Sequence, residues 1–242
     1  MVPFAAGPPR DELVVVATSP ELASAAAAAI AADLRRAVAD RGAASLVLAG
    51  GSTPRPVYEL LAAAELPWDR IELFFGDERC VPPDHDDSNF AMVETCLLRA
   101  LPGPPPAVHR IRGELGPRAA ARAYDQVLRK HCEARGGWDV VLLGLGEDGH
   151  TASLFPAALP TEDGRLAAEG RAPVVPHERV TFTLRGLASC RQVVFLARGA
   201  SKLPALRSVL ASSPAQSGVP PAALVAGRRR WFVDLAALTG VS

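Results

Sequence analysis

The chain has 242 residues, of which 49% are hydrophobic and only 5% aromatic, and its 26 basic residues balance 26 acidic ones. This length allows one or two domains with a sizeable core, and a core rich in Ala, Val and Leu is typical of helices packed on a parallel sheet. A formal charge of zero without basic clusters argues against nucleic acid as the main partner.

The N-terminal residues Met1–Pro9 have neither the basic start nor the long apolar stretch of a signal peptide, and we expect residues 1–10 to be a flexible segment. The alanine-rich stretch Ala23–Ala32 is too short to span a membrane, and Glu21 and Asp33 flank it. The four cysteines have no C-x-x-C pair and no zinc spacing, which indicates free thiols in a reducing compartment. These features predict a cytoplasmic protein.

Apolar, β-branched runs alternate with helical segments along the chain. The alternation predicts βαβ units, and therefore an α/β fold with a mostly parallel sheet that helices cover on both faces. The connection Pro102–Pro106 is expected to be a loop inside one domain that spans residues 1–242. In chain order, the predicted elements are a strand at Leu13–Ala17, a helix to about Asp40, a strand at Ser45–Ala49, a helix through Tyr58–Ala64, a strand at Ile71–Phe75, helices near Asn89–Arg99 and at Arg118–Glu133, strands at Trp138–Leu143, Arg179–Leu184 and Gln192–Leu196, a helix at Ser201–Leu210 and a strand at Arg230–Asp234.

Gly50, Gly51, Ser52 and Thr53 form a short turn between the second predicted strand and the helix that follows it. The glycines let a ligand approach the backbone closely, and free amides at a helix start can bind an anion together with two hydroxyls. A plain turn with a hydroxyl cap is the alternative. The spacing of a nucleotide P-loop is absent, so the turn is a candidate phosphate site of another kind.

Asp77-Glu78-Arg79 follows the third predicted strand, at the sheet edge where α/β proteins bind ligands. Asp77 could orient a histidine or a sugar hydroxyl, and Arg79 could bind a phosphate through two hydrogen bonds. A solvated charge cluster explains these residues equally well. Arg179 and Lys202, each at the start of a later predicted element, could join the hydroxyl turn around a phosphate dianion or could face solvent.

Asp148 and His150 follow the predicted strand Trp138–Leu143 in a glycine-rich turn. Histidine has the unperturbed pKa closest to neutral pH, so His150 is the candidate proton acceptor at this edge. A structural histidine is the alternative. Ser153 is a weak candidate nucleophile, because no Gly-x-Ser-x-Gly elbow surrounds it and a capping or hydroxyl-binding role fits it better. The other histidines have no metal-ligand spacing, so no metal site is expected.

The glycines Gly144, Gly146 and Gly149 also match the dinucleotide fingerprint. A pyrophosphate needs bare backbone amides, yet Glu147 and Asp148 would place two negative charges beside it. The match also lies late in the chain rather than in the first turn between a strand and a helix. A dinucleotide cofactor is therefore not expected.

Three motifs in the same order resemble the 6-phosphogluconolactonase family. The resemblance covers about Leu13 to Asp234 and extends through Arg179-Val-Thr and Gly199-Ala-Ser-Lys202. It implies the three-layer α/β/α Rossmann-like fold that this family shares with glucosamine-6-phosphate deaminases and ribose-5-phosphate isomerases. The motifs are Leu48-Ala-Gly-Gly-Ser-Thr-Pro54, Phe75-Gly-Asp-Glu-Arg-Cys-Val-Pro82 with Ser88-Asn89, and Gly144-Leu-Gly-Glu-Asp-Gly-His-Thr-Ala-Ser-Leu-Phe-Pro156.

The resemblance implies an enzyme that hydrolyses 6-phospho-D-glucono-1,5-lactone to 6-phospho-D-gluconate in the oxidative pentose phosphate pathway, without a cofactor or metal. His150 corresponds to the family's general base, with the acids Asp148 and Asp77 around it. The implied partner is a small sugar-phosphate lactone, with neither nucleic acid nor membrane, and a monomer or homodimer is expected. The residues implied to contact substrate or phosphate are Gly50, Gly51, Ser52, Thr53, Arg79, Arg179 and Lys202.

Two other functions stay open. Deaminases of the related family carry Phe-Asn-Glu-Pro after the Asp-Gly-His turn and Asp-Glu-Tyr after the third strand. This chain has Phe155 in place of that glutamate and Arg79 in place of that tyrosine, and both differences favour a lactonase. A non-catalytic sugar-phosphate sensor would keep the hydroxyl turn and lose the proton acceptor, but His150 is present and no basic helix-turn-helix is attached.

Overall fold

Seven strands form one sheet, and every pair of neighbouring strands is parallel. The computed structural model describes residues 10–161, 163–213 and 218–240, so the expected N-terminal segment 1–10 lies outside the described residues except for Arg10. The order across the sheet is β1-β10-β9-β6-β2-β3-β5. The strands are β1 (Arg10–Val16), β2 (Ala44–Leu48), β3 (Ile71–Phe75), β5 (Ala107–His109), β6 (Trp138–Gly144), β9 (Cys190–Ala197) and β10 (Arg228–Asp234).

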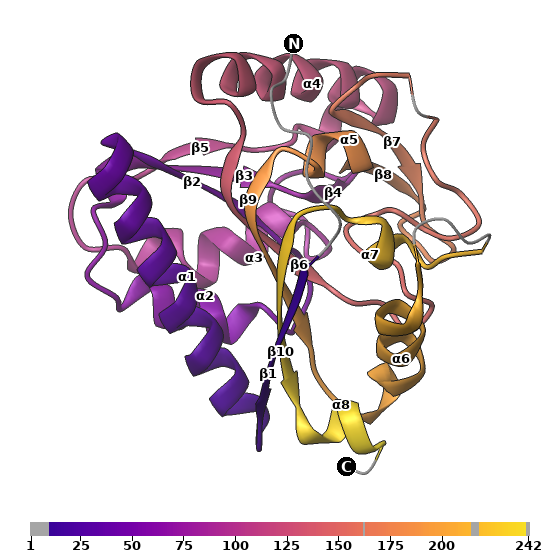
Figure 1. Cartoon of the computed structure of the whole chain (residues 1–242). Coiled ribbons are helices and arrows are strands. Elements are labelled where there is room, and N and C mark those ends of the chain that lie inside the picture. The colour runs from indigo at the N-terminus through magenta and orange to yellow at the C-terminus, as the bar shows by residue number, and fades with distance from the viewer. Residues whose placement is uncertain (1–9, 162, 214–217, 241–242) are drawn as a thin grey trace.

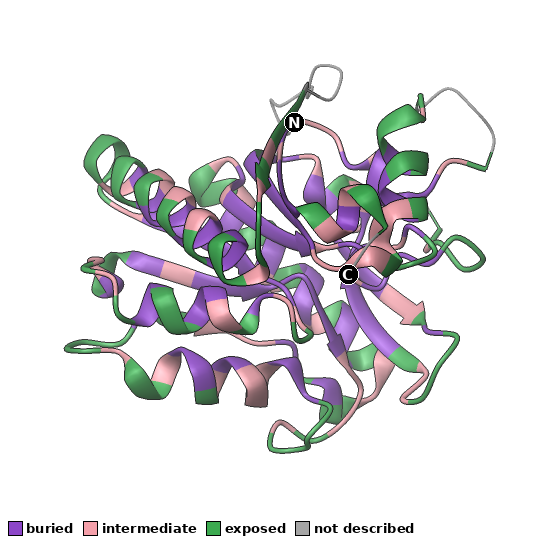
Figure 2. Cartoon of the chain, turned by 90° about the horizontal axis from the view of Figure 1, so that it is seen from below, coloured by how far each residue is buried: buried purple, intermediate pink, exposed green. Residues whose placement is uncertain are grey.

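Continuous apolar runs explain why this sheet is parallel and enclosed. All five residues of β2 are buried, and β6 and β9 are buried over most of their length. Strands covered on both faces lose the polar and apolar alternation of a half-exposed strand. Figure 2 shows the buried residues concentrated in the strands and in the helix faces that turn toward them. Most of the apolar residues therefore lie in the core around this sheet.

Helices lie on both sides of the sheet, which confirms the predicted layers (Figure 1). On one side α1 packs against α2, and α2 packs against α3. On the other side α6 contacts α7 and α8, while α4 packs on a second, smaller sheet. The helices are α1 (Ser19–Arg41), α2 (Arg55–Ala62), α3 (Asn89–Cys96), α4 (Pro117–Arg135), α5 (Leu184–Leu187), α6 (Leu203–Ala211), α7 (Pro221–Leu224) and α8 (Leu235–Thr239).

The first helix begins and ends where its sequence signals predict. The Thr18 hydroxyl accepts a hydrogen bond from the Glu21 amide at 3.4 Å, and the Glu21 carboxylate accepts one from the Thr18 amide at 3.3 Å. This reciprocal pair satisfies amides that have no partner within the helix. Gly42 ends α1 at a φ of 76°, a left-handed conformation that glycine adopts without steric cost.

The second sheet is antiparallel, in the order β4-β8-β7, and consists of β4 (Asp77–Arg79), β8 (Glu178–Phe182) and β7 (Ala167–Arg171). The strand predicted at Arg179–Leu184 exists at slightly earlier residues, but it belongs to this sheet rather than to the parallel one. β4, β5 and β7 were not predicted, because none contains an apolar run. β4 consists of three charged residues that cross-strand pairing with β8 holds in place.

Chain order divides the main sheet between β2 and β6. From β2 the chain runs outward to β3 and β5, then returns to β6 and continues to β9 and β10. The loops that leave the carboxyl ends of β2 and β6 therefore diverge, and open α/β sheets bind ligands in the crevice at such a point. The hydroxyl turn, Gly50–Thr53, and the Asp148–His150 turn both leave the sheet there.

The edge strand β1 is fastened to β10 by a buried charged group. The Arg229 guanidinium donates hydrogen bonds to the two Asp11 carboxylate oxygens at 2.7 and 2.6 Å. The Trp231 indole N–H donates to the same carboxylate at 2.7 Å. Paired planar groups of this kind satisfy the hydrogen-bond donors of a buried arginine. Arg229 and Asp11 therefore join β1 to β10 at the edge of the sheet.

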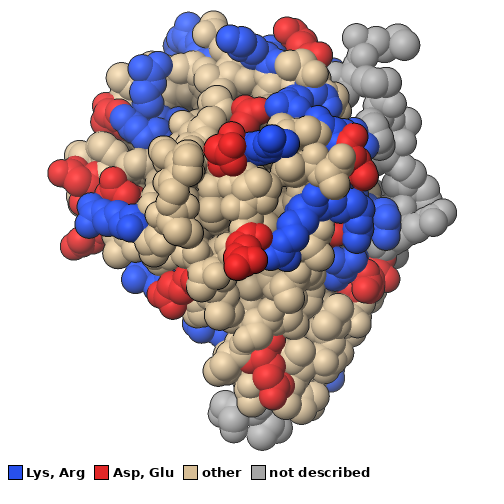
Figure 3. Space-filling model, turned by 90° about the vertical axis from the view of Figure 1, so that its left-hand side faces the viewer, with Lys and Arg blue, Asp and Glu red and all other residues tan. Residues whose placement is uncertain are grey.

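Charges of both signs are interspersed over the face shown in Figure 3. This distribution fits the balanced composition of the chain. Among the helices that the structure describes, none is both long enough and apolar enough to cross a membrane.

Candidate active site

A pocket of about 240 Å³ lies at the carboxyl ends of β2, β3 and β6, where the chain order divides the sheet. The proton acceptor predicted after β6 and the hydroxyl turn predicted after β2 both open onto this one pocket. Asp148 and Arg179 are not part of its wall. The predicted residues that line it are Gly50, Gly51, Ser52, Thr53, Asp77, Arg79, His150 and Lys202.

Two buried tyrosines hold the ends of the strands that carry the pocket. The Tyr58 hydroxyl accepts from the Ala49 amide at 2.8 Å and donates to the Ala49 carbonyl at 2.7 Å. Tyr124 does the same for Phe75 at the end of β3, at 2.8 and 2.9 Å. Burial raises the pKa of both phenols, so they stay neutral and act as fixed partners for backbone groups that leave the sheet.

The hydroxyl turn is open because two of its positions exclude side chains. A Cβ built on Gly50 would overlap the Asn89 side-chain amide, and Gly51 has a φ of 92° that other residues rarely adopt. Ser52 is exposed and Thr53 is half-buried. The turn therefore presents backbone and hydroxyl groups, rather than bulky side chains, to the pocket.

His150 is oriented by Asp148. The Asp148 carboxylate oxygen Oδ1 lies 2.5 Å from His150 Nδ1 and accepts the His150 backbone N–H at 3.0 Å. Partial burial raises the pKa of Asp148, but the hydrogen bonds from His150 outweigh it and hold that pKa below its ordinary value. An ionised carboxylate only accepts hydrogen bonds, so Nδ1 carries the proton of this pair, and in the neutral ring Nε2 is the acceptor.

The glycines of the Asp148–His150 turn serve packing. A Cβ on Gly146 would overlap the His150 ring, and a Cβ on Gly149 would overlap Pro220. These close approaches explain two of the three glycines that match the dinucleotide fingerprint. Gly146 therefore leaves room for the imidazole, and Gly149 leaves room for Pro220.

Asp77 lines the pocket without contacting His150 through any hydrogen bond in the described part of the chain. Its carboxylate accepts a hydrogen bond from Ser153 Oγ at 2.5 Å and one from Asn89 Nδ2 at 3.3 Å. Asp77 therefore ties the His150 loop to the start of α3, and Asp148 is the acid that orients the base. Ser153 is buried, donates its proton to Asp77 and does not line the pocket, so the geometry does not support it as a nucleophile.

Replacing Ser153 with alanine distinguishes a structural role, as a hydrogen-bond donor to Asp77, from a role as nucleophile. Ser153→Ala removes the shortest hydrogen bond of a buried carboxylate, and we expect the free energy of unfolding to fall by about 1–3 kcal/mol. We expect kcat to stay within about tenfold of the wild-type value, since no covalent step is lost. Denaturant unfolding and steady-state kinetics measure the two effects. Abolished turnover with unchanged stability would make Ser153 a nucleophile.

The three predicted cations divide into two that line the pocket and one that does not. Arg79 and Lys202 line the pocket, and Lys202 Nζ lies 3.9 Å from a Glu147 carboxylate oxygen. Arg179 pairs with Arg79 across β4 and β8, but its guanidinium donates to the carbonyls of Pro176 and Glu178. Burial, and then the nearby Arg79 charge, lower the pKa of Arg179. The structure thus brings two of the three predicted cations to the pocket.

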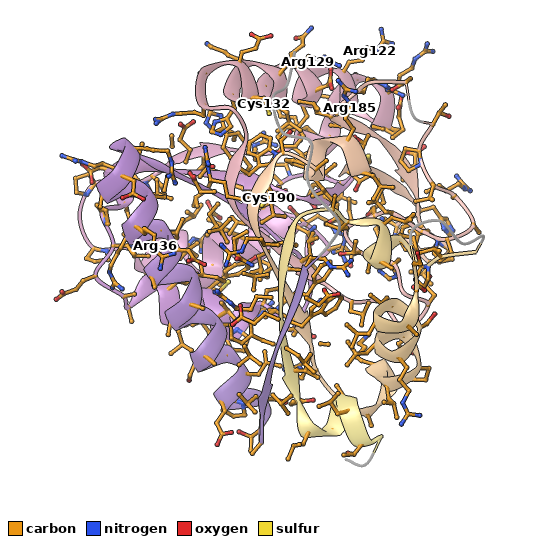
Figure 4. All side chains as sticks on the ribbon, viewed as in Figure 1. Arg36, Arg122, Arg129, Cys132, Arg185 and Cys190 are labelled. Atoms are coloured by element: carbon orange, nitrogen blue, oxygen red, sulfur yellow. The ribbon has the colours of Figure 1, made fainter. Side chains whose placement is uncertain are left out.

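The cysteines do not form disulfides, and burial makes them poor nucleophiles. Burial raises the pKa of the Cys80 thiol, next to Arg79, to about 11, and that of Cys132 in α4 to about 11. Cys132 and Cys190 are labelled in Figure 4, in α4 and at the start of β9. Within the described ranges no cluster of three or more His, Cys, Asp and Glu residues could hold a metal ion.

Comparisons with known proteins show which family the chain belongs to. A family model described as glucosamine-6-phosphate isomerases/6-phosphogluconolactonase matches residues 17–233. The chain belongs to this family. A 6-phosphogluconolactonase of Nostoc sp. is 40% identical over 212 residues, which cover 84% of this chain and 87% of the relative.

Solved structures confirm the fold of the glucosamine-6-phosphate isomerase/6-phosphogluconolactonase family for this chain. The crystal structure of a 6-phosphogluconolactonase from Thermotoga maritima matches with a TM-score of 0.82 and 31% identity, over 93% of this chain and 100% of that one. A monomeric glucosamine-6-phosphate deaminase matches with a TM-score of 0.78 at 21% identity, over 93% and 98% of the two chains, and shows the fold alone. The predicted α/β/α class is therefore confirmed.

Within this family fold, sequence reasoning missed a buried acid that builds the site. The Glu78 carboxylate accepts hydrogen bonds from the amides of Arg79, Asn89 and Phe90, each at 2.8 Å. Burial raises the pKa of Glu78, and the amide hydrogen bonds oppose that rise. Glu78 thus fastens the start of α3 to β4. Nothing in a run of three charged residues signals that the middle one is buried.

Two further residues, Asn89 in the pocket wall and Arg198 beside Ser52, also come from outside the predicted set. Asn89 lines the pocket and donates Nδ2 to the Asp77 carbonyl at 2.9 Å. Arg198 directly follows β9 and donates Nη2 to Ser52 Oγ at 3.3 Å. A cation at the end of a predicted strand, on the ligand edge of the sheet, was the available signal for Arg198.

Proposed function

We propose that this chain is a 6-phosphogluconolactonase that opens 6-phospho-D-glucono-1,5-lactone to 6-phospho-D-gluconate in the pentose phosphate pathway, with His150 as general base. Relatives that carry this name over most of the chain support the activity. The Asp148–His150 hydrogen bond, at a pocket that also holds the hydroxyl turn, supports the general-base role. The proposed reaction uses no cofactor or metal.

The chemistry follows from the orientation of His150. With Nδ1–H held by Asp148, Nε2 takes a proton from a water molecule as that water attacks the lactone carbonyl carbon. The tetrahedral intermediate then collapses, the bond to the ring oxygen breaks, and the imidazolium returns its proton to that oxygen. An oriented general base contributes about 10²–10⁴-fold to such a reaction.

The remaining pocket residues divide between the two ends of the substrate. In this proposal Ser52, Thr53 and Lys202 bind the phosphate. Arg79 or the glycine amides stabilise the oxyanion, a role that contributes about 10²–10³-fold in other enzymes. Arg179 stays a prediction from the family resemblance, because its guanidinium donates to loop carbonyls outside the pocket wall.

Replacing Lys202 with alanine tests the phosphate end. We expect Lys202→Ala to raise KM about tenfold or more and to change kcat less, because the ammonium binds the phosphate equally in the ground state and the transition state. Steady-state kinetics on the phosphorylated lactone provide the measurement. Lys130→Ala, at an exposed position of α4, is the matched control. An unchanged KM for Lys202→Ala would remove this lysine from the phosphate site.

A direct assay decides between the lactonase and its two rivals. Freshly generated 6-phosphogluconolactone is supplied, and formation of 6-phosphogluconate is compared with spontaneous hydrolysis. A lactonase accelerates this step and releases no ammonia from glucosamine 6-phosphate. Ammonia release would identify a deaminase. Binding of the sugar phosphate without hydrolysis would identify a sensor.

We further propose a cytoplasmic protein that is a monomer or homodimer, with residues 1–242 forming one domain. The four free cysteines support a reducing compartment. The first strand, β1, and the last strand, β10, are neighbours in the main sheet, which supports one domain. Light scattering on a size-exclusion column measures the oligomeric state, and a mass above that of a dimer would contradict the proposal.

A further inference from the structure

Arg198, in the loop after β9, reaches across the edge of the sheet to the hydroxyl turn. β9 and β2 are separated in the sheet by β6, so their carboxyl ends lie about 10 Å apart. Only a long side chain spans such a gap. Arg198 is the first residue after β9, and its Nη2 donates a hydrogen bond to Ser52 Oγ at 3.3 Å.

The backbone that carries Arg198 is fixed from behind. Gly199, with a φ of 90°, donates its amide N–H to Asp234 Oδ1 at 2.9 Å. Asp234 is buried, and it also accepts the Ala237 amide at 3.0 Å and the Ser19 hydroxyl at 2.8 Å. The backbone next to Arg198 is therefore tied through Asp234 of β10 to α1 and α8.

The hydrogen bond from Arg198 determines whether the Ser52 hydroxyl acts as donor or acceptor in this pair. A guanidinium has five donors and no acceptor, so Ser52 Oγ is the acceptor in this pair. The Ser52 proton is then free to point into the pocket that Ser52 lines. A hydroxyl that accepts from a guanidinium can donate its own proton to an anion, and the nearby cation strengthens that hydrogen bond.

In the described part of the chain, the charge of Arg198 has no acidic partner. Lys202 Nζ has a Glu147 carboxylate oxygen at 3.9 Å, and the buried Arg229 is paired with Asp11. Over the described residues, no carboxylate lies within ion-pair distance of Arg198. An arginine with free donors beside a hydroxyl turn is suited to bind phosphate through two hydrogen bonds.

We propose that Arg198 is a substrate-binding residue that contacts the phosphate of the lactone directly and holds the Ser52 hydroxyl as a second donor to it. This inference rests on the proposed function and deepens it. It adds a cation that the family resemblance did not supply. It also accounts for the phosphate end of the pocket without moving Arg179 from its loop carbonyls.

Kinetics of Arg198→Ala and Arg198→Lys test this assignment, with Arg207→Ala on the exposed side of α6 as the matched control. We expect Arg198→Ala to raise KM for the phosphorylated lactone about 10–100-fold with kcat changed by less than about threefold. Inhibition by inorganic phosphate should weaken in parallel. Arg198→Lys should recover only part of the affinity, because an ammonium cannot form the two parallel bonds.

Calorimetry keeps this test independent of turnover. Binding of 6-phosphogluconate should weaken about 10–100-fold in Arg198→Ala, whereas binding of gluconate, which has no phosphate, should not change. Ser52→Ala combined with Arg198→Ala should weaken binding by less than the product of the two single effects, since the two residues act together. Unchanged phosphate affinity in Arg198→Ala would overturn the assignment. A wild-type protein that binds 6-phosphogluconate but hydrolyses nothing would overturn the proposed function instead.

Discussion

Replacing His150 with alanine is expected to lower kcat by about 10²–10⁴-fold, the contribution of an oriented general base. KM for the phosphorylated lactone should change little, because Ser52 and Lys202 keep their places. The lowered pKa of Asp148 means that its carboxylate stays ionised at neutral pH and is lost only as the pH falls below the ordinary aspartate range. The carboxylate that orients His150 is therefore present at neutral pH, where steady-state kinetics measure the loss of turnover in His150→Ala.

The pH profile also distinguishes a lost base from a damaged fold. Turnover that survives in His150→Ala must use hydroxide, so its rate should rise steadily with pH. His177→Ala, at a histidine outside the pocket wall, is the control and should keep the wild-type profile. Turnover at the wild-type rate in His150→Ala would show that another group removes the proton.

Adding a single methyl group at Gly146 should displace the base without removing it. The backbone of Gly146 is not in the left-handed region, so alanine is tolerated there, but its Cβ would occupy the space of the His150 ring. We expect Gly146→Ala to lower kcat about 100-fold, because a general base that moves by one ångström loses its alignment with water. Steady-state kinetics and the imidazole signals of His150 in NMR measure the two consequences.

Gly144→Ala provides the matched control in the same loop. A Cβ at Gly144 meets no atom within 4 Å, so the His150–Asp148 pair stays in place. Since Gly144 lines the pocket, any effect of this change should fall on KM more than on kcat. Equal losses of kcat in the two variants would show that Gly146 does not act by seating the ring.

The main sheet could be predicted because its strands carry their own signal. Ile71–Phe75 is found at the predicted residues, and the first helix, predicted to about Asp40, ends at Arg41. The antiparallel sheet could not be predicted, since β4 has no apolar run and is stabilised by pairing with residues about one hundred positions later. Local sequence contains no information about such a partner.

The candidate site was predicted at the level of loops but not of contacts. His150 and the hydroxyl turn follow strands whose carboxyl ends must share one edge, so their meeting follows from topology. Topology does not determine which group each acid contacts. Asp77 and Asp148 look equivalent in the sequence, yet one bonds Ser153 and the other His150. Arg198 was missed because its role depends on a side chain that passes over β6.

The position of β1 at the sheet edge has a consequence for how the protein is made. Asp11 meets Arg229, which lies 218 residues further along the chain, and among the described residues β10 is the only strand beside β1. A ribosome adds about 5–20 residues per second, so β1 waits roughly 10–40 s for its partner to emerge. Until then its valines lack their sheet partner, and an unpaired strand of this kind favours aggregation.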